Sequence, residues 1–389
     1  PTPTPTLDDQ IGEDVTGSTS AGHSVAVNCD GTIMAMGAPN ASNYKGEVSV
    51  YEFNSGTGSW ALKGTKLTGH GILTGSGWGE RFGTSVSLNS SGNRIAIGAP
   101  YLDNNNNYSY NKAGAAYVFD FSGSSWTQYL KSHTTTPLQK RGTSVKLNAS
   151  GNILIIGSNA RLNNNNNWTD SGYVDVYADN GTSWDRLGGR IFGGSTVSQY
   201  AHSFARQAYN QFGYSVSCNN LGTRIIIGAP RNDPNTHRKK GGYAKVFEYR
   251  NISRSEWDDA NRDGYTSDEK VLIRGSYIEW SPNTYYWIQV GSTLYDSSIP
   301  SSTATNTADY RDYFGISVDM NQQGDRVIVG AHHSGITNTS HPAYNTRGSA
   351  TLYELSLNEW NTLGCLIAGP LHTFDEGGEF GRSVSINAA

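Results

Sequence analysis

The strongest constraint on this chain is a short phrase that it repeats six times. The phrase reads Gly-x-Ser-Val, where x is any residue, and its copies begin at Gly22, Gly83, Gly142, Gly213, Gly315 and Gly381. Successive copies begin 61, 59, 71, 102 and 66 residues apart, so most units hold about 60 residues. A regular period of this kind is typical of a repeat architecture, in which each unit buries its apolar face against its neighbours.

The serine of this phrase raises the question of catalysis, because Gly-x-Ser is also the start of a nucleophile elbow. The elbow needs a second glycine two residues after the serine. In the six copies that position holds Ala26, Ser87, Lys146, Ser217, Asp319 and Ser385. A catalytic serine is needed once, whereas a structural serine can serve in every repeat. We therefore predict that the serine hydrogen-bonds to backbone in a crowded inner strand, that the glycine permits the preceding turn, and that the valine enters the core.

Each full unit continues with three further segments that have the composition of strands. After the phrase (segment A) and a polar turn comes segment B, a β-branched run that reaches a Gly near its end, at 94–100, 153–159, 224–230 and 326–332. Segment C opens with Gly and alternates, at 46–53, 114–121, 172–179, 242–249 and 348–355. Segment D carries a tryptophan, at 59–64, 125–130, 183–188 and 359–364. Val, Ile, Tyr and Phe at period two, separated by Gly- and Asn-rich turns, predict an all-β protein.

Four antiparallel strands per unit, repeated six or seven times, predict a β-propeller of four-stranded blades. Segment B is apolar on both faces, as suits a strand packed between neighbouring blades, and its small Gly-Ala-Pro ending lets backbones crowd near the central channel. The longest spacing, from Gly213 to Gly315, either hides a degenerate unit with 270–276 as a worn segment B, or carries an insertion. We place an insertion at about 251–284, after which Trp287 is the tryptophan of a segment D.

The paired motifs resemble the FG-GAP repeat of integrin α-subunit propellers. Phe-Gly occurs at 82–83, 212–213, 314–315 and 380–381, and Gly-Ala-Pro at 37–39, 98–100 and 228–230. The resemblance covers nearly the whole chain and implies seven blades and a role in adhesion or ligand binding. Members of that family often carry an Asp-rich calcium loop between A and B, but the turns here read NCDG, NSSG, NASG, NNLG and NQQG. The family's calcium sites are therefore not expected at these turns.

The balance of charge argues against two classes of partner. Lys and Arg number 29 against 33 Asp and Glu, which gives a net charge of −4, and charged residues make up only 16% of the chain. Nucleic acid and anionic membranes both favour a strongly basic surface. No run approaches the ~18 apolar residues of a membrane-spanning helix. We expect neither a nucleic-acid partner nor membrane insertion.

Asparagine indicates the compartment better than cysteine does. The three cysteines cannot all pair, and Cys218 occupies a slot that is apolar in other repeats, so we expect it in the core. Asn-x-Ser/Thr sequons occur at Asn40, Asn89, Asn107, Asn148, Asn167, Asn180, Asn251 and Asn338. Residues 1–6 (PTPTPT) are typical of an extended linker ahead of a propeller at 7–389. These features predict an extracellular glycoprotein, secreted or on the cell surface.

The connections that join B to C are the longest and suggest a ligand surface. Because strands alternate in direction, the B–C and D–A connections share one face of the propeller, and the A–B and C–D connections share the other. Runs of asparagine recur in two successive B–C connections, at 104–107 and 163–167. They are either solvated low-complexity loops or a polar face that binds sugar through Asn105, Tyr108, Tyr110, Asn165 and Trp168. Glycans on Asn107 and Asn167 would cover that face and argue against the second interpretation.

The segment 259–269 (DANRDGYTSDE) resembles the opening of a calcium loop. Oxygen ligands at alternate positions can surround one cation, and a glycine then allows the sharp turn. The twelfth position of this loop holds Lys270 where glutamate is required, so Asp268 or Glu269 would have to substitute. We predict either a structural calcium site or an acidic surface turn. The predicted ligands are Asp259, Asn261, Asp263, Tyr265, Asp268 and Glu269.

These observations predict an extracellular structural or adhesive module within a longer glycosylated surface or filament protein. Its expected partners are other copies of itself, neighbouring extracellular proteins or glycans. A lectin-like, glycan-binding propeller is the second hypothesis. A polysaccharide-active enzyme is the third, and would require Tyr, His, Arg and Asp side chains to converge at the channel mouth. The stretch 7–14 aligns with Leu363–Ala368, so the sequence is cut inside a longer repeat protein, its termini complete one mixed blade, or its open edge pairs with another molecule.

Overall fold

The computed structural model describes residues 10–69, 79–103, 112–134, 138–159, 162–164, 167–169, 172–192, 210–231, 241–251, 253, 255, 284–296, 313–332, 348–369 and 379–387. Within them the chain forms five antiparallel sheets, each with successive strands in the order of segments A to D. We call these sheets blades 1 to 5. One helical turn, α1 (Ala41–Tyr44), follows the second strand of blade 1. The all-β prediction is confirmed.

The strands of each blade follow one another along the chain. Blade 1 holds β1 (Ser24–Val27), β2 (Ile33–Ala38), β3 (Glu47–Asn54), β4 (Ser59–Leu62) and β5 (Leu67–Thr68). Blade 2 holds β6 (Ser85–Leu88), β7 (Arg94–Ala99), β8 (Ala115–Phe121) and β9 (Trp126–His133). Blade 3 holds β10 (Arg141–Leu147), β11 (Ile153–Ser158), β14 (Tyr173–Asp179), β15 (Trp184–Arg186) and β16 (Ile191–Phe192).

The last two blades repeat this plan. Blade 4 holds β17 (Ser215–Cys218), β18 (Arg224–Ala229), β19 (Tyr243–Asn251) and β20 (Tyr285–Gln289). Blade 5 holds β21 (Ser317–Met320), β22 (Arg326–Ala331), β23 (Ser349–Ser356), β24 (Glu359–Thr362) and β25 (Ile367–Ala368). A separate ribbon of β12 (Leu162–Asn164) and β13 (Asn167–Thr169) lies between β11 and β14 along the chain.

The pairing of β19 with β20 shows what the longest repeat spacing contains. Asn251 at the end of β19 lies opposite Tyr285 at the start of β20, so the two strands are segments C and D of one blade. The chain between them is therefore an insertion within blade 4, and Trp287 in β20 is the tryptophan of its segment D. The stretch 270–276 lies outside the described residues.

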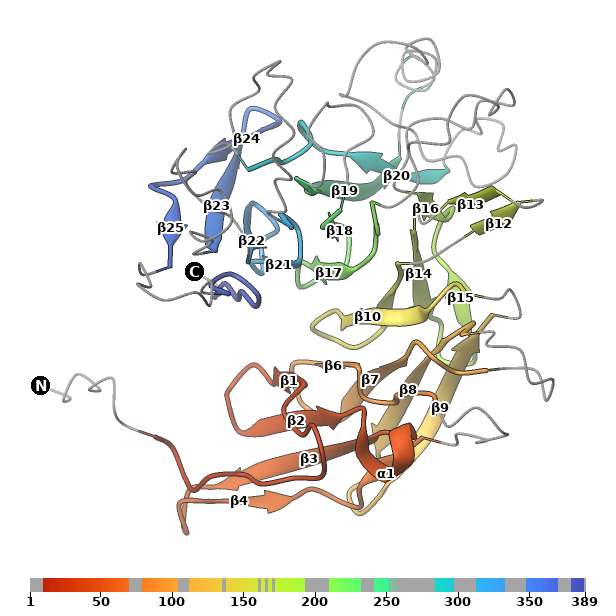
Figure 1. Ribbon diagram of the computed structural model, residues 1–389, viewed down its shortest axis with the longest axis vertical. Helices are drawn as coiled ribbons and strands as arrows, with labels where there is room; N and C mark the ends of the chain where they lie inside the picture. Colours follow the sequence, from red (N-terminus) through yellow and green to blue (C-terminus); the bar gives the residue numbers. More distant parts are fainter. Residues whose placement is uncertain are drawn as a thin grey trace, which may run out of the picture.

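The five blades lie side by side around a common centre, with the first strand of each blade innermost (Figure 1). These inner strands are neighbours in the order β1, β6, β10, β17, β21. The serine of the repeated phrase joins them, because its Oγ donates to the carbonyl oxygen of the glycine that opens the next copy. The distances are 2.8–3.1 Å for Ser24, Ser85, Ser144, Ser215 and Ser317. The predicted structural role of this serine is confirmed.

Glycine is required at two places around the inner ring. The glycines that open the six phrases have φ between +81° and +87°, a region that L side chains rarely adopt. The glycine near the end of segment B faces the next inner strand: a Cβ on Gly98 would collide with the carbonyl oxygen of Gly142 and the Oγ of Ser85. The crowding predicted for the Gly-Ala-Pro ending is confirmed. Together the serine and the two glycines allow successive blades to approach backbone to backbone.

The apolar B strands fill the space between blades from both faces. In β7, Ile95 and Ile97 pack in the core shared by blades 1 and 2. Ala96 on the opposite face packs in the core shared by blades 2 and 3. Cys218 is fully buried, which raises the pKa of its thiol to about 12, so it behaves as a core hydrophobe as predicted. Burying such side chains on both faces contributes about 1.5–3 kcal/mol for each large one.

The tryptophan of segment D links blades 2, 4 and 5 to the blade before each of them, whereas the indole Nε1 of Trp184 in blade 3 is buried without a hydrogen-bond partner among the described residues. The indole Nε1 of Trp126 donates to the carbonyl oxygen of Lys63 at 2.8 Å, and Trp287 and Trp360 make equivalent bonds at 2.9 Å. In blade 1 the acceptor for Trp60 is Ile11, at 3.1 Å. Residues 10–12 therefore occupy the place of a preceding segment D, in accord with the alignment of 7–14 to Leu363–Ala368.

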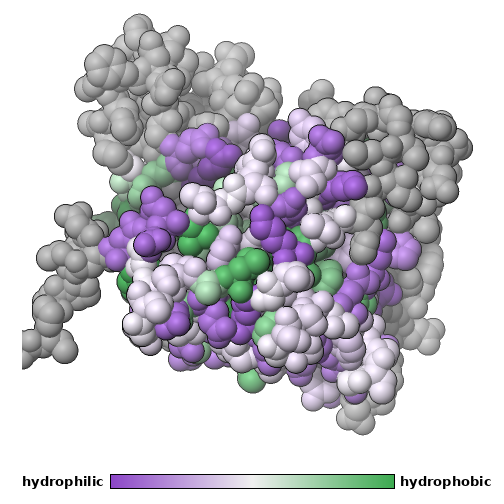
Figure 2. Space-filling view, turned by 90° about the horizontal axis from the view of Figure 1, so that it is seen from below, coloured by the Kyte–Doolittle hydropathy of each residue, from purple (hydrophilic) through white to green (hydrophobic). Residues whose placement is uncertain are grey.

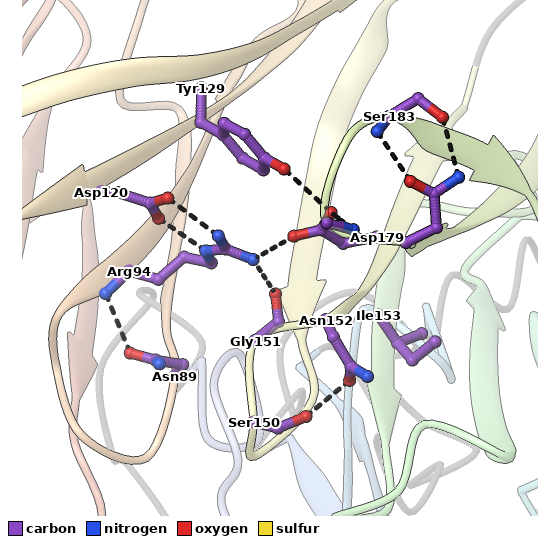
Figure 3. A network of polar contacts seen from close by, with 12 residues as sticks. Asn89, Arg94, Asp120, Tyr129, Ser150, Gly151, Asn152, Ile153, Asp179 and Ser183 are labelled. Carbon is purple, nitrogen blue, oxygen red and sulfur yellow. Dashed lines mark hydrogen bonds and ion pairs between the residues drawn. The ribbon is translucent and has the colours of Figure 1, made fainter.

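An arginine at the start of segment B clamps neighbouring blades on the outer side (Figure 3). Arg94 in β7 bonds both carboxylate oxygens of Asp120 in its own blade, at 2.5 and 2.8 Å. Its Nη1 reaches Asp179 at 2.7 Å and the carbonyl oxygen of Gly151 at 3.0 Å, both in blade 3. Tyr129 covers the guanidinium, 4.9 Å from its ring centre, and its hydroxyl also donates to Asp179. The clamp holds the A–B turn of one blade against the next.

Blade 3 replaces an aromatic contact with buried charge. In blade 2, Phe82 packs edge-on against Tyr117. The equivalent pair in blade 3 is Arg141 and Asp175, whose side chains are 2% and 0% exposed and bond at 2.7 Å. Arg190 donates two further bonds of 2.9 Å to the same carboxylate. Burial alone would raise the pKa of Asp175, but these two guanidinium groups outweigh it and lower the pKa.

Blade 1 shows what an inner strand looks like with no described blade before it. Val25 and Val27 are 62% and 55% exposed, whereas the equivalent Val145 and Leu147 are 6% and 2% exposed. In the view of Figure 2, purple and white residues cover most of the coloured surface and hydrophobic residues form small groups. Within the described residues, no helix is long and apolar enough to cross a membrane.

Candidate functional site

The connections of successive blades meet on two opposite faces, as the strand order predicts. On one face, D–A and B–C connections bond through backbone: Tyr101 N–H donates to the Glu80 carbonyl at 3.2 Å, and Lys140 N–H to the Lys112 carbonyl at 3.0 Å. We call this the loop face. On the other face the A–B turns form a chain, in which Ser90, Ala149 and Asn220 each donate a backbone bond of 2.9–3.1 Å to the next turn.

Tyr101 is the centre of a group of cations on the loop face. It follows the Gly-Ala-Pro ending of β7 and is half-buried. The Arg81 guanidinium lies 4.7 Å from its ring centre, and the ammonium groups of Lys112 and Lys140 lie at 5.0 and 6.0 Å. Arg81 also lies over Tyr44, at 5.5 Å. A cation over an aromatic face is attracted by the ring's quadrupole, so the ring helps to hold these positive groups together.

The backbone fixes two of these cations in place. Arg81 and Lys140 stand two residues before the glycine of the repeated phrase and have φ of +53° and +48°. A threonine in the phrase caps each turn: Thr84 Oγ1 donates to the Arg81 carbonyl at 2.7 Å, and Thr143 Oγ1 to the Lys140 carbonyl at 2.8 Å. The same position is left-handed at Ser20, Gln211 and Tyr313 in other copies, so this backbone belongs to the repeated D–A turn.

Further polar groups approach from the inner strands. The variable residue of the phrase is His23 in blade 1, Tyr214 in blade 4 and Arg382 after blade 5. The pKa of His23 is lowered by partial burial and by the positive charges of Arg382 and Arg81. Burial raises the pKa of Tyr214, against the opposing effect of Arg382 and Arg231. At neutral pH both His23 and Tyr214 are therefore uncharged while the arginines beside them are cationic.

We call these eight residues the channel-mouth cluster. It comprises His23, Arg81, Tyr101, Lys112, Lys140, Tyr214, Arg231 and Arg382. Two nearby carboxylates are engaged by the protein: Glu80 is 2% exposed and accepts a bond of 2.8 Å from the Tyr117 hydroxyl, and Glu379 forms an ion pair with Arg382. The cluster gathers cationic side chains, two tyrosines and a histidine on one face. It can bind an anion or stack against a planar ring, and its His and Tyr are neutral groups that can exchange protons.

The residues predicted for ligand and metal binding lie almost entirely outside the described residues. Asn105, Tyr108, Tyr110 and Asn165 lie outside the described residues, as do the predicted calcium ligands 259–269. For Trp168 the backbone is described: it lies in β13, opposite Asn163 of β12. Asn163, Asn164 and Asn167 of the asparagine run lie in the paired strands β12 and β13, and neither the loop nor the sugar-binding interpretation is decided by this pairing. Among the described residues, no His, Cys, Asp and Glu side chains gather as a metal-binding group.

Two of the predicted glycosylation sites are part of the fold. Asn89 and Asn148 are 5% and 4% exposed. Each Oδ1 accepts a backbone N–H across the A–B turn, from Arg94 and Ile153 at 3.0 and 2.9 Å, and each Nδ2 donates to a side chain of the same turn. A glycan on either amide would disrupt this turn, so the burial of both amides argues against these sequons. Serine follows these turn asparagines because it joins the same hydrogen-bond network.

The remaining sequons differ in exposure. Asn180 and Asn251 are exposed, and Asn40 is half-buried with its Nδ2 donating to Ser20 at 2.8 Å. Asn167 lies in β13, where the backbone alone is described. Asn107 and Asn338 lie outside the described residues. Among the described sequons, Asn251 is exposed and its amide forms no hydrogen bond with another described residue, whereas the Nδ2 of Asn180 donates to Ser183 Oγ and Asp185 Oδ2 at 2.9 and 2.6 Å.

Sequence reasoning missed the channel-mouth cluster. Apart from Lys112, which stands two residues before the glycine of segment C, its members occupy three positions that differ from copy to copy: the variable residue of the phrase, the residue two before its glycine, and the residue after Gly-Ala-Pro. Repetition identified the residues that are the same in each unit and passed over those that change. The usable signal was the strand order itself, which places all three positions at the same end of the blades.

Comparison with known proteins identifies the repeat in one blade. The family model of the FG-GAP repeat matches residues 76–119, which include the segments A and B of blade 2 and most of its segment C. Blade 2 is an FG-GAP repeat. The same phrase and strand order recur in the other four blades. No curated protein matches the chain. Among solved structures, hydrazine synthase of Kuenenia stuttgartiensis matches with 9% identity and a TM-score of 0.42, over 92% of this chain and 69% of that one.

Proposed function

We propose that this protein is an extracellular structural or adhesive propeller that binds its partners through the loop face. The observation that carries the proposal is the convergence of connections from successive blades on one face, held by backbone hydrogen bonds to a rigid inner ring. Loops placed by a rigid scaffold are the usual carriers of binding residues. The FG-GAP repeat supports the location, because such repeats are typical of surface and extracellular proteins. Its partners are neighbouring extracellular proteins, glycans or other copies of the chain.

Selective blocking of each face tests this proposal. Cys29 is an exposed thiol on an A–B turn, and Asp103 is exposed on a B–C connection of the loop face. One variant carries Asp103→Cys with Cys29 and Cys365 changed to serine, and the other keeps Cys29 with Cys365→Ser. Both are coupled to polyethylene glycol and displayed on beads flowing over surfaces coated with extracellular matrix proteins or glycans. We expect retention to be lost with the label at residue 103 and kept with the label at residue 29. Equal retention of the two would refute the loop face as the adhesive surface.

A second candidate function is a polysaccharide-active enzyme. It is favoured by one observation: neutral His23 and Tyr214 lie within the field of Arg81, Arg231 and Arg382 at the channel mouth. A neutral base beside fixed positive charge suits proton abstraction from a substrate that bears an anion. Incubation with acidic polysaccharides and measurement of newly formed chain ends tests it. Activity that falls strongly in Tyr214→Phe would establish the enzyme, whereas no new ends from the unaltered chain would remove it.

Calcium is proposed as a structural ligand of the insertion in blade 4. The proposal rests on the alternating oxygen ligands of 259–269 in the sequence. Calcium should raise the melting temperature of the protein, and a chelator should lower it, because an ion bound only by the folded state stabilises that state. Asp259→Asn with Asp263→Asn should abolish the difference. A melting temperature that does not respond to calcium would leave the segment as an acidic surface turn.

A further inference from the structure

Blade 1 presents to solvent the face that the other blades bury. In its inner strand β1, Val25 and Val27 are 62% and 55% exposed. In blades 2 to 5 the preceding blade packs on this face, and the position of Val27 is only 2–9% exposed. The residues at that position are Leu88, Leu147, Cys218 and Met320. The uncovered face of β1 therefore has the same apolar character as four faces that are contacts between blades.

Blade 5 is uncovered on its opposite face. Ile367 in β25 is 48% exposed, whereas the equivalent Leu67 in blade 1 and Ile191 in blade 3 are 7% and 0% exposed. Phe380, just before the last copy of the phrase, is 40% exposed. Its equivalents Phe82, Phe212 and Phe314 are fully buried, because each packs against an aromatic ring of segment C in the blade that follows.

The segment 379–387 lies between these two faces, in the place of the first strand of a sixth blade (Figure 1). Ser317 Oγ donates to the Gly381 carbonyl at 2.8 Å, the bond that joins successive inner strands elsewhere. The Ser385 hydroxyl and the Ile386 N–H both donate to the carboxylate of Asp319 in β21, at 3.1 and 3.0 Å. Within the described residues, no strands B, C and D continue this blade.

A tryptophan socket on blade 5 shows where strand D of this blade would lie. A Cβ on Gly64, Gly188 or Gly291 would lie 2.6–3.1 Å from the segment D tryptophan of the blade that follows. The indole N–H of that tryptophan donates to the carbonyl just before the glycine. Leu363 and Gly364 are the equivalent pair in blade 5, and a Cβ on Gly364 would meet no described residue within 4 Å.

A second socket, on blade 1, shows where strand B would begin. The A–B turns of blades 2 to 5 each contain a glycine whose Cβ would lie 2.6–3.3 Å from the first side chain of segment B in the preceding blade. These contacts join Gly92 to Ile33, Gly151 to Arg94, Gly222 to Ile153 and Gly324 to Arg224. Gly31 is the equivalent glycine of blade 1, and a Cβ there would meet no described residue within 4 Å. The two sockets therefore lie on opposite walls of one surface.

We propose that this surface, between blades 5 and 1, binds a β-sheet segment of the FG-GAP type from a partner polypeptide, which supplies strands B, C and D of a sixth blade. The four existing contacts between blades define its chemistry: a strand B apolar on both faces, an aromatic ring on strand C to cover Phe380, and a tryptophan on strand D to donate to the Leu363 carbonyl. A second copy of the chain fits less well, because its described B, C and D strands are already paired within blades.

The inference goes beyond the proposed function, because this surface lies on the side of the ring and not on the loop face. Val27→Cys, in the full chain with Cys29 and Cys365 changed to serine, reports whether the surface is covered. Cys218 is the internal control, since it occupies the same position in blade 4 and is 6% exposed. We expect a maleimide to modify the cysteine at residue 27 in the native protein and Cys218 only after unfolding.

The probe is residues 93–131 of this chain on a soluble carrier protein, since they carry segments B, C and D of blade 2. At saturation it should slow modification at residue 27 at least tenfold, whereas the carrier alone should not. The same residues fused after residue 389 should protect the thiol as well, because fusion raises their effective concentration. Protection by neither form would refute the proposal.

Two pairs of variants connect the protection to the two walls. Trp126→Ala in the probe removes the side chain for the socket at Gly364, and Val25→Asp in the chain places a charge on the face of blade 1. Each should weaken binding of the probe about tenfold or more. Leu357→Asp is the matched control in the chain, because Leu357 is 98% exposed on the C–D turn of blade 5. Equal binding by the probes with and without Trp126 would overturn the assignment.

The remaining outcomes identify other occupants. A thiol at residue 27 that is unreactive in the monomer would show that the chain covers this face itself. Protection that grows with the concentration of the chain alone, together with a dimer in sedimentation, would assign the face to a second copy. Either result overturns the proposal. If a label at residue 103 abolishes adhesion while the probe fails to bind, this inference is wrong and the proposed function stands.

Discussion

Removing the buried carboxylate of blade 3 should destabilise the protein far more than removing an exposed one of the same kind. Asp175 is fully buried and compensates Arg141, which is 2% exposed, while Arg190 is 26% exposed and can turn toward water. Asp175→Asn keeps the shape of the side chain and deletes its charge. Arg141 is then left as an uncompensated buried cation, for which the expected loss is about 3–5 kcal/mol of the free energy of unfolding.

Asp120→Asn is the matched control, because Asp120 also bonds an arginine with both oxygens. Its side chain is 39% exposed, and Arg94 retains Asp179 and the Gly151 carbonyl after the change. Exposed pairs contribute about 0.2–1 kcal/mol, so this variant should lose about 1 kcal/mol or less. The two variants therefore differ in the burial of the carboxylate that is removed. They also differ in whether the arginine beside it keeps another negatively charged partner.

Urea unfolding followed by tryptophan fluorescence measures both changes. A loss of about 4 kcal/mol shifts the midpoint by roughly 1–2 M, since the slope of stability with urea is a few kcal/mol/M for proteins of ordinary size. Repeat proteins can unfold in parts, so hydrogen exchange of β14 against that of β8 localises the effect to blade 3. Equal losses for Asp175→Asn and Asp120→Asn would refute the argument from burial. Arg141→Phe with Asp175→Tyr, which copies the pair of blade 2, should recover most of the loss.

Three further predictions follow from the same contacts. Folding lowers the pKa of Asp175, so the unfolded chain binds a proton at this carboxylate first as the pH falls. The stabilisation is present above the ordinary carboxyl pKa and is lost as pH falls through the folded value. Asp175→Asn should therefore make the free energy of unfolding less dependent on pH below about pH 4. Ser144→Ala removes a buried bond between inner strands and should cost about 0.5–1.5 kcal/mol, against less than about 0.5 kcal/mol for exposed Ser122→Ala in the same urea assay. Gly188→Ala and Gly364→Ala both strain a left-handed backbone, but a Cβ at 188 also lies 3.0 Å from Trp287, whereas a Cβ at 364 meets no described residue within 4 Å. Gly188→Ala should therefore cost about 1 kcal/mol more of the free energy of unfolding. Equal urea midpoints for the two variants would refute the packing role of the indole.

The repeated positions of the sequence predicted the fold well, because each of them could be compared across six copies of the phrase. The serine of the phrase could be assigned to structure before any coordinates were known, since its partner is a backbone carbonyl that every blade provides. The glycines could be assigned to turns and close approach for the same reason. The tryptophan of segment D was recognised as part of the pattern, but its acceptor in the preceding blade was not, because that contact joins residues about 50–100 positions apart.

The positions that break the pattern could not be predicted in the same way. Arg141 stands where four of the other five copies have phenylalanine, and its burial depends on Asp175 and Arg190, two residues that only the folded blade brings together. The sequons at Asn89 and Asn148 satisfied a local rule, yet the same Asn and Ser close the A–B turn. A local motif cannot show whether its side chain points outward or bonds across a turn. That information lies in the contacts between blades.

The division between repeated and variable positions also separates stability from function in this chain. Serine and glycine at fixed places join one inner strand to the next, so a change there weakens the contact between two neighbouring blades. The variable residue of the phrase lies beside them at the end of the same strand, held at the centre of the molecule without taking part in those bonds. It can therefore be histidine, tyrosine or arginine without cost to the ring. A scaffold of this kind brings unlike side chains from distant segments together at one end of the blades, while the bonds that join the blades stay the same.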